Sequence, residues 1–336
     1  MIKVSVVVPV YKVPLEYLRA CLDSLMAQTL QESEFIIVSD GAPAAERSIC
    51  EEFTIKDPRF KFFQQKHSGV SPARNHGIDQ VQGEYITFVD ADDWIEKETC
   101  EKTYKYAKEN NSDIVLWEAE TTNNNHHEPL FSQSINKIES SEIHNICRNC
   151  IFTANSKYYS VSLVSCKLFS RTFIKENHIY YPTELQINED RIFNINAYAK
   201  ANKISYLNQV LYYYRIHSES TSQQFIPNAF YKATAFLNIL EKKMQHSFSR
   251  ELFKEYIRSF FCSWKSCYMH PQNKESFVTR TSHLSHIIKS DEFQNNLQKN
   301  SFKDFSFDVQ IELFLFKHRL TFPIYINAIK SLIFKK

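Results

Sequence analysis

Residues 3–38 of the chain have the sequence KVSVVVPVYKVPLEYLRACLDSLMAQTLQESEFIIV. The run from Lys3 to Val10 is rich in β-branched residues, which predicts a strand, and the segment from Glu34 to Val38 predicts a second one. Between them, apolar residues recur every three or four positions from Leu15 to Leu30, which is the spacing of an amphipathic helix. These segments together predict the βαβ unit of a parallel sheet.

The same alternation continues to Glu118. Further helices are expected over Ala44–Thr54, Ser71–Gln80 and Glu96–Glu109, and further strands over Phe60–Gln64, Tyr85–Val89 and Asp113–Glu118. Strands that alternate with helices predict an α/β fold with a mostly parallel sheet covered by helices on both faces. Ligands of such sheets bind beyond the carboxyl ends of the strands, so Tyr11, Asp40 and the Asp90 to Asp93 cluster are expected to converge on one crevice.

The second half of the chain is less regular. Residues 121–133, which include His126 and His127, are polar and predict a surface loop, and Lys203–Tyr214 predicts a strand. From about residue 227 the sequence changes to amphipathic helices without any glycine. We therefore expect a domain boundary near Phe225, between a catalytic domain over residues 1–225 and a helical region over residues 226–336.

The composition excludes several classes of protein. The chain has 336 residues, of which 43% are hydrophobic and 23% charged, so it can bury a core without disulfides or metal. Its 40 Lys and Arg against 38 Asp and Glu give a formal net charge of +2, too balanced for a protein that coats nucleic acid. The amino-terminal segment lacks a charged leader and a small-residue cleavage site, so we expect a cytoplasmic protein.

Cysteine and glycine usage narrows the chemistry further. Eight cysteines are scattered along the chain, and reduced thiols are expected in a protein without a secretion signal. Cys147 and Cys150 form a CxxC, but no second pair stands at zinc-ligand spacing, and the role of the two thiols stays open. The four glycines match neither the dinucleotide-binding nor the Walker A spacing. All four lie in the first quarter of the chain, where we expect the ligand site.

The strongest local signal is Asp90-Ala-Asp92-Asp93, which directly follows an expected strand. Carboxylates at a strand end can face a hard divalent cation, and Mg²⁺ or Mn²⁺ held by one or two of them neutralises a leaving diphosphate. The alternative is an acidic turn that caps the helix expected near Glu96. The cluster alone does not decide between the two.

Four segments, in this order, resemble the motifs of family 2 glycosyltransferases: VSVVVPVY (4–11), EFIIVSDG (34–41), GVSPARNHGI (69–78) and GEYITFVDADDW (83–94). The resemblance extends from about Val4 to Ser222 and is strongest to bacterial enzymes that build capsules, lipopolysaccharide and teichoic-acid decorations. It implies a GT-A fold, in which a Rossmann-like, mostly parallel sheet is flanked by helices. It also implies a donor that is usually a UDP-sugar and inversion at the anomeric carbon.

The resemblance assigns the donor site residue by residue. It implies that Tyr11 flanks the base, that the Pro9 backbone lies beside it, and that Asp40 accepts from the ring NH. An aromatic face suits a base, and a carboxylate selects a donor edge. Arg74 would bridge this pocket to the carboxylate cluster. The family usually has a further acid where this chain has Ser39, but the acid that faces the base is the second one.

The resemblance also implies a metal and a diphosphate clamp. Asp92 is the expected ligand of Mn²⁺ or Mg²⁺, and Asp90 is the expected contact to ribose or to metal-bound water. Arg215 suits phosphate oxygens, and His217 suits either phosphate or metal. A lone histidine without such a role is an equal alternative for His217.

The segment Asn188-Glu-Asp190 resembles the family's acidic pair at the start of a helix. Asp190 is the expected catalytic base, and Glu189 is a weaker candidate that would contact donor or acceptor. The alternative is simple helix initiation, since Asn188 is a good cap and acids favour the first turn. Lys167 and Trp94 are weaker candidates of the same kind, with a solvated lysine as the alternative for Lys167.

These residues predict an inverting, metal-dependent glycosyltransferase that acts on a hydroxyl of a cell-surface glycan or its lipid-linked precursor. Nucleotidyl transfer is a rival, but it calls for a glycine-rich phosphate loop. An inactive sugar-binding or partner-binding module of the same fold is another, and the combination of Asp92, Asp190 and Arg215 argues against it.

The carboxy-terminal tail from Leu313 is basic and apolar. Such a segment can lie on an anionic membrane surface, where a lipid-linked acceptor is found. The alternative is a helix packed on the catalytic domain or on a second subunit. No stretch reaches the roughly 20 apolar residues that span a bilayer, because Val309–Phe334 contains five charged or proline positions.

Overall fold

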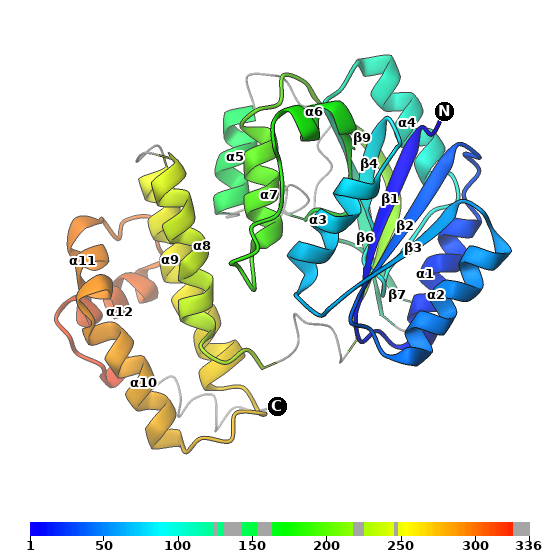
Figure 1. Ribbon diagram of the computed structural model, residues 1–336. Helices are drawn as coiled ribbons and strands as arrows, with labels where there is room; N and C mark the ends of the chain where they lie inside the picture. Colours follow the sequence, from blue (N-terminus) through cyan, green and yellow to red (C-terminus); the bar gives the residue numbers. More distant parts are fainter. Residues whose placement is uncertain (124–125, 131–142, 153–162, 218–224, 245–247, 325–336) are drawn as a thin grey trace. The chain divides into compact units, whose positions relative to one another are not determined.

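The computed structural model describes residues 1–123, 126–130, 143–152, 163–217, 225–244 and 248–324. The chain divides into two compact units, Met1–His217 and Ser218–Lys336 (Figure 1). The first unit ends at His217, and the domain boundary near Phe225 stays a prediction. The Ile216 amide donates to the Thr122 carbonyl, so the chain is still bound to the sheet at that residue.

The first unit alternates strands and helices as the sequence predicted. In chain order its described elements are β1 (Val4–Val10), α1 (Leu15–Met26), β2 (Ser33–Asp40), α2 (Ala44–Lys56), β3 (Phe60–Gln65), α3 (Val70–Gln80), β4 (Tyr85–Phe88), β5 (Trp94–Ile95), α4 (Thr99–Asn110), β6 (Ile114–Asn123), β7 (His126–Pro129), α5 (Ile143–Ile151), β8 (Lys167–Ser170), α6 (Arg171–Glu176), α7 (Glu189–Tyr198) and β9 (Ile204–Arg215).

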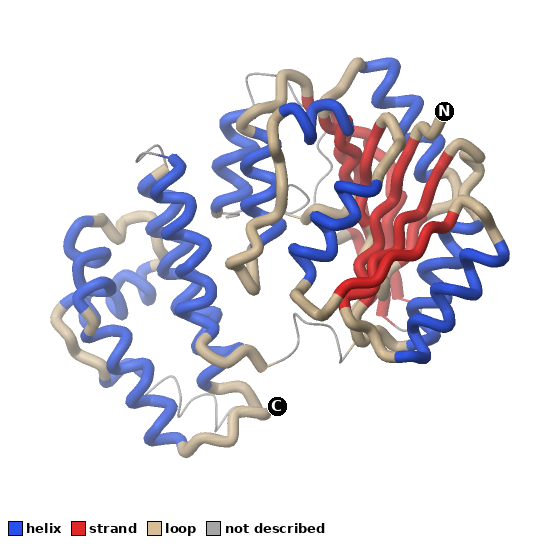
Figure 2. The backbone as a smooth tube through the Cα atoms, in the orientation of Figure 1, coloured by secondary structure: helices blue, strands red, loops and turns tan. Residues whose placement is uncertain are grey.

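These strands form one sheet in the order β3-β2-β1-β4-β8-β6-β9-β5, with β7 paired to β6 (Figure 2). The part from β3 to β4 is parallel, as is the β6 and β9 pair. The short strand β8 lies antiparallel between β4 and β6, so the sheet is more mixed than the mostly parallel sheet that we expected. Residues 121–123 and 126–129 form a hairpin rather than the expected surface loop, because Thr121 to Asn123 continue strand β6.

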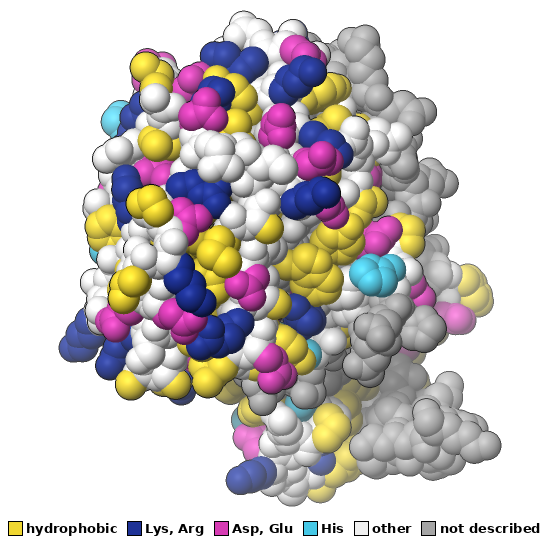
Figure 3. Space-filling model, turned by 90° about the vertical axis from the view of Figure 1, so that its right-hand side faces the viewer, with side chains coloured by type: hydrophobic (Ala, Val, Ile, Leu, Met, Phe, Trp, Pro, Cys, Tyr) yellow, Lys and Arg dark blue, Asp and Glu magenta, His cyan; other side chains and the backbone are white. Residues whose placement is uncertain are grey.

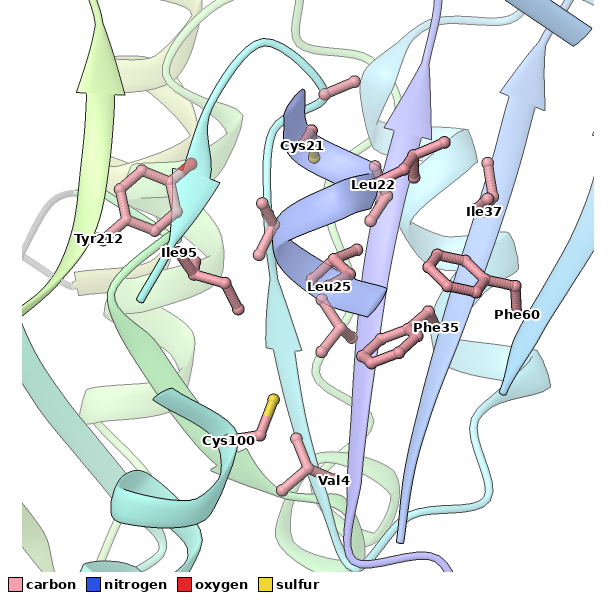
Figure 4. Close-up of a cluster of buried hydrophobic side chains, with 14 of the residues drawn as sticks. Val4, Cys21, Leu22, Leu25, Phe35, Ile37, Phe60, Ile95, Cys100 and Tyr212 are labelled. Carbon is pink, nitrogen blue, oxygen red and sulfur yellow. The ribbon is translucent and has the colours of Figure 1, made fainter. Parts of the chain in front are cut away.

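One face of the sheet is covered by α1, α2 and α4. Alternate residues of β1, from Val4 to Val10, point to this face and are buried. Figure 4 shows Leu22 and Leu25 of α1 beside Phe35 of β2 in this layer. The period-2 burial of β1 and the helical period of α1 are therefore the reason that the two elements pack together.

The opposite face carries α3 and α7, and there β1 presents Val7. A Cβ at Gly77 of α3 would lie 2.3 Å from Val7 Cγ1, so only glycine permits this approach of helix and strand. The ring of Phe193 from α7 packs against Phe88 of β4 and Phe169 of β8. The two helices that carry the predicted Arg74 and Asp190 are thus seated directly on the sheet.

A buried carboxyl group lies at an irregular point of this sheet. The pairing of β6 with β9 shifts register on both sides of Glu118. The Glu118 side chain is 9% exposed and accepts no hydrogen bond from the residues that the structure describes. Burial alone raises the pKa of Glu118 to about 7.

The second unit is helical, as expected. Its described elements are α8 (Ala229–Met244), α9 (Ser249–Ser263), a π-helical turn (Trp264–Tyr268), α10 (Phe277–Lys289), α11 (Asp291–Lys299) and α12 (Phe307–Lys317). The ring of Phe260 contacts the rings of Phe230, Phe293 and Phe316, which joins α8, α9, α11 and α12 in one aromatic core.

The surface agrees with the balanced composition. On the face that Figure 3 displays, basic and acidic side chains lie interspersed. Across the described ranges, no helix combines the length and the apolar composition needed to cross a bilayer. All eight cysteines lie in the described ranges; none of them forms a disulfide, and seven are buried, among them Cys147 and Cys150 of α5.

Candidate active site

The strand ends bring the predicted residues to one edge of the sheet. Pro9 and Tyr11 lie at the carboxyl end of β1, Asp40 ends β2, and Asp90 follows β4. Because β2, β1 and β4 are adjacent and parallel, these ends are neighbours. These residues therefore lie at one edge of the sheet, as the alternating pattern predicted.

Tyr11 lies at the half of this edge where the resemblance placed the base. Its ring stacks on the His67 imidazole, with ring centroids 3.9 Å apart and planes 16° apart. Lys12 Nζ lies 5.2 Å from the Tyr11 centroid. The tyrosine therefore presents an aromatic surface that is already ordered by a neighbouring ring.

Asp40 is buried and holds the loop that follows β3. Its Oδ1 accepts from Gln65 Nε2 and from the Ser68 amide, each at 2.8 Å. Its Oδ2 accepts from the Gly69 amide at 2.8 Å and lies 2.8 Å from His67 Nδ1. A carboxylate offers about four lone-pair positions, so these partners use its acceptor capacity. In this conformation a base reaches Asp40 only by replacing one of them.

Arg74 joins the two halves of the site. Its Nη2 donates to Asp90 Oδ1 at 2.8 Å, and its Nη1 donates to Asp190 Oδ1 at 2.5 Å and to Glu189 Oε1 at 3.3 Å. The Arg74 side chain is 4% exposed. Burial opposes its charge, but Asp190 and Asp90 outweigh that effect and raise the Arg74 pKa. The Tyr181 ring completes the setting, with its centroid 5.2 Å from the guanidinium carbon.

Glu189 and Asp190 form the first turn of α7, where the sequence placed them. Asn188 precedes them with φ of 64°, and its side chain makes no capping bond, contrary to the expected role. Burial raises the pKa of Asp190 to about 7, with Arg74 opposing and Glu189 and Asp90 adding to the shift. Burial therefore outweighs the helix dipole, which favours the ionised form of an acid in the first turn.

Asp92 and His217 meet across the sheet edge. Asp92 Oδ2 lies 3.0 Å from His217 Nε2, and the two side chains are 31% and 10% exposed. Burial, and then the charge of Asp90, raise the pKa of Asp92. His217 also meets the Tyr17 ring edge-on, with centroids 5.0 Å apart.

Arg215 lies beside this pair in an aromatic clamp. Its guanidinium carbon is 4.2 Å from the Tyr17 centroid and 4.5 Å from the Trp94 centroid. Its Nε donates to the Asp92 carbonyl at 2.8 Å. Trp94 also stacks on Tyr213, so the clamp is anchored in the β5 and β9 pair. Trp94 thus holds Arg215 in place at the edge of the site.

Asp93 departs from the expected convergence of the cluster. It is buried, accepts from the Tyr212 hydroxyl at 2.6 Å, and accepts from the Arg215 amide at 2.8 Å. Burial and the neighbouring Asp92 and Asp90 raise its pKa well above the usual range. Asp93 therefore ties strand β9 to the end of β4, and only Asp90 and Asp92 remain partly exposed at the edge.

Lys167 is buried, so the alternative of a solvated lysine is wrong. It is 0% exposed on β8, and its Nζ donates to the Leu163 carbonyl. Burial lowers its pKa to about 8. Asn194 of α7 donates to the same carbonyl. The shared carbonyl therefore links Lys167 to α7, and a contact of Lys167 to donor or acceptor stays a prediction.

The metal-ligating side chains at this edge are suited to a hard divalent cation that takes its remaining ligands from water and phosphate. Asp92 supplies carboxylate oxygens, His217 supplies a ring nitrogen, and Asp90 adds charge nearby. Within the described residues no three His, Cys, Asp or Glu are arranged as a metal cluster. A pair of this kind fits Mg²⁺ or Mn²⁺, which take remaining ligands from water and phosphate, rather than a closed structural site.

Several residues of this site escaped the sequence analysis. His67, Tyr17 and Tyr181 each contact a predicted residue through their rings. His67 lies two positions before Gly69, the residue that precedes α3. Its closeness to this predicted glycine motif was the available signal that it belongs to the site. Tyr17 and Tyr181 lie in segments with no motif, and only the folded chain brings them to the site.

Comparison with known proteins identifies the same family. The family model described as Glycosyl transferase family 2 matches residues 5–159. EpsH of Bacillus subtilis strain 168, a putative glycosyltransferase, is 28% identical over 94% of this chain and 92% of its own length. TarS of Staphylococcus aureus strain MW2, a poly(ribitol-phosphate) β-N-acetylglucosaminyltransferase, is 29% identical over 78% of this chain and 44% of its own length. The chain thus spans less than half of that second relative.

The fold comparison agrees with the sequence comparison. The crystal structure of S. aureus TarS 1-349 in complex with UDP-GlcNAc matches with a TM-score of 0.65 and 20% identity, over 99% of this chain and 92% of that one. At this identity the match establishes the fold. Residues 5–159 therefore belong to glycosyltransferase family 2, and the chain is a glycosyltransferase of the GT-A fold.

Proposed function

We propose that this chain transfers a sugar from a UDP-sugar, with inversion, to a hydroxyl of a bacterial cell-surface glycan or its lipid-linked precursor. The observation that carries the proposal is the placement of Arg74 between Asp90 and Asp190. It holds a carboxylate of the donor half and a carboxylate of the acceptor half at a fixed separation. A fixed separation of the residues that would contact donor and acceptor favours a reactive arrangement of the two substrates.

The proposal of a UDP-sugar donor rests on the residues near the expected position of the base and on the relatives. Tyr11 offers a stacking face beside the loop that Asp40 holds, and Pro9 adjoins it on β1. The TarS structure matched above holds UDP-GlcNAc, which makes a UDP-sugar the first donor to test. Relatives that act on poly(ribitol-phosphate) support a surface glycan as the acceptor class.

Asp92 and His217 would hold Mn²⁺ or Mg²⁺ with the donor diphosphate. A divalent cation there supplies charge that stabilises the departing nucleoside diphosphate. Arg215 contributes a second positive charge, and the rings of Tyr17 and Trp94 fix its direction. A pre-oriented guanidinium stabilises developing negative charge without reorganisation during the reaction.

Asp190 is the proposed base. Its side chain is 25% exposed, so a hydroxyl can reach it, and Arg74 fixes one of its oxygens. The base must take the acceptor proton while the hydroxyl oxygen attacks the anomeric carbon opposite the diphosphate. Attack from that side gives the inverted product.

The test is a transfer reaction with UDP-sugars and an acceptor glycan, with the anomeric configuration of the product read by NMR. Metal-dependent transfer with inversion is the expected result. A product that retains the donor configuration would disprove the single-displacement role of Asp190. Binding of UDP-sugar with neither transfer nor hydrolysis would favour the inactive binding module, and release of diphosphate from a nucleoside triphosphate would favour nucleotidyl transfer.

A further inference from the structure

Helix α12 is apolar on two opposite sides. At about 100° per residue, Leu313 and Phe316 face the core of the helical unit, where both are fully buried. Phe307, Ile311 and Phe314 follow one another at i, i+4 and i+7 on the other side, and they are 74%, 44% and 57% exposed. We call these three residues the apolar stripe. A helix with apolar residues on two opposite sides is typical of one that is covered on both.

The exposed apolar surface continues past the helix. Leu320 and Phe322 are 46% and 49% exposed in the segment that follows α12. Isolated exposed apolar side chains are ordinary, but a series of large ones along one short segment marks an interaction surface. Four of the described elements nearby, α8 to α11, leave this side of α12 uncovered.

The charge of this region indicates which partner fits. From Leu313 to the carboxy terminus the sequence has no Asp or Glu and has five basic residues, Lys317, Arg319, Lys330, Lys335 and Lys336. Lys317 and Arg319 follow the apolar stripe directly, and Asp308 lies at its far end. A cluster of basic residues beside aromatic and aliphatic side chains is suited to an anionic lipid surface, since headgroups attract the cations and the stripe enters the acyl boundary.

We propose that the apolar stripe docks the enzyme on an anionic membrane surface. A second copy of the chain is the other possible occupant, and the experiment below distinguishes it from a membrane by the oligomeric state. The inference rests on the proposed function only for its purpose, which is to bring the site to a lipid-linked acceptor. Docking itself is measured without turnover.

The experiment is flotation of the full chain with vesicles of phosphatidylglycerol or of phosphatidylcholine alone. The variant Phe307→Ser/Ile311→Ser/Phe314→Ser removes the stripe, and Val278→Ser is the matched control, since Val278 is 75% exposed on α10 of the same helical unit. We expect the wild type and the control to float with anionic vesicles, and the stripe variant to lose roughly tenfold or more in partitioning. Added salt should weaken the wild type.

Equal flotation of the stripe variant and the wild type would overturn the proposal. So would a wild type that ignores vesicles but dissociates from dimer to monomer when the stripe is replaced, since that assigns the stripe to a second copy. If the triple variant does not fold, Phe307→Ser alone carries the test, because Phe307 is the most exposed member. UDP affinity separates the two claims: a stripe variant that binds UDP normally but not vesicles fails in docking alone.

Discussion

Arg74 Nη1 lies 2.5 Å from Asp190 Oδ1, and it joins α3 to the first turn of α7 across more than a hundred positions of sequence. The same guanidinium holds Asp90 through its other terminal nitrogen. The proposed base is therefore oriented by a residue that also fixes the donor half. A substitution of Arg74 would therefore disturb both halves of the site.

Asp190→Asn should lower turnover roughly 100- to 10,000-fold while UDP affinity stays near that of the wild type, because a positioned base acts in the chemical step and not in donor binding. Glu189→Gln is the matched control, since Glu189 is the weaker partner of Arg74 at 3.3 Å. Steady-state transfer and calorimetric UDP binding are the measurements. If Glu189→Gln were inactive and Asp190→Asn near normal, the base would be Glu189.

The turnover of the wild type should rise with pH from about 6 to about 8 and then level off. Burial raises the pKa of Asp190 to about 7, and only its ionised form accepts the acceptor proton. Below that pKa the carboxyl is protonated, so activity falls as pH decreases. An Asp of ordinary pKa would give a flat profile over this range. UDP affinity measured at the same pH values separates loss of chemistry from loss of binding.

Asp92→Asn should weaken UDP binding in Mn²⁺ and leave the residual binding measured with a chelator unchanged. The substitution removes a ligand charge but keeps the shape of the side chain. Asp93→Asn serves as a contrast, because Asp93 bonds Tyr212 and the Arg215 amide inside the protein, so its replacement should lower the melting temperature. Unchanged UDP affinity in the Asp92 variant, with and without metal, would remove the metal assignment.

Glu118→Gln should stabilise the protein above neutral pH. The pKa of about 7 in the native state lies above the ordinary glutamate pKa of about 4.5, so the native state binds the proton more tightly. The contribution of Glu118 to stability is therefore most favourable below about pH 4.5 and is lost as pH rises to about 7, a change of roughly 3 kcal/mol at about 1.4 kcal/mol per unit. Urea unfolding at several pH values should show a flatter profile for the variant. Glu109→Gln on exposed α4 should keep the wild-type slope.

Gly77→Ala should destabilise the protein by about 1 to 3 kcal/mol, since the added methyl meets Val7 Cγ1. Val7→Ala has its own cost, but in the double variant it makes room for that methyl. We expect a favourable coupling energy in the double-mutant cycle measured by denaturant unfolding. Strict additivity of the two substitutions would show that Val7 is not the obstacle.

The alternation of strands and helices over residues 3–118 was readable because period 2 and period 3.6 are strong in that segment. Strand β8 was not, since Lys167–Ser170 is too short to show a period and is placed by its neighbours in the sheet. The hairpin after Thr121 was hidden by polar composition, because its residues lie at the end of a long strand and not in the core.

The order of the motifs predicted which residues lie at the strand ends. It did not predict which contacts each of them makes. Asp92 and Asp93 are adjacent and chemically identical in sequence, yet one meets His217 and the other is enclosed by Tyr212. That difference depends on where β9 returns to the sheet. Local sequence carries no information on such a long-range pairing.

The Asp40 carboxylate holds residues 65–69 in place by hydrogen bonds. This affects any attempt to change the donor nucleotide that the protein accepts. Asparagine at position 40 would keep the shape but offer only one acceptor oxygen to the amides of Ser68 and Gly69 and the Gln65 side chain. The loop would be released before any preference for a different base emerged. If Asp40 contacts the base as proposed, a change of nucleotide specificity therefore calls for replacing position 40 and residues 65–69 together.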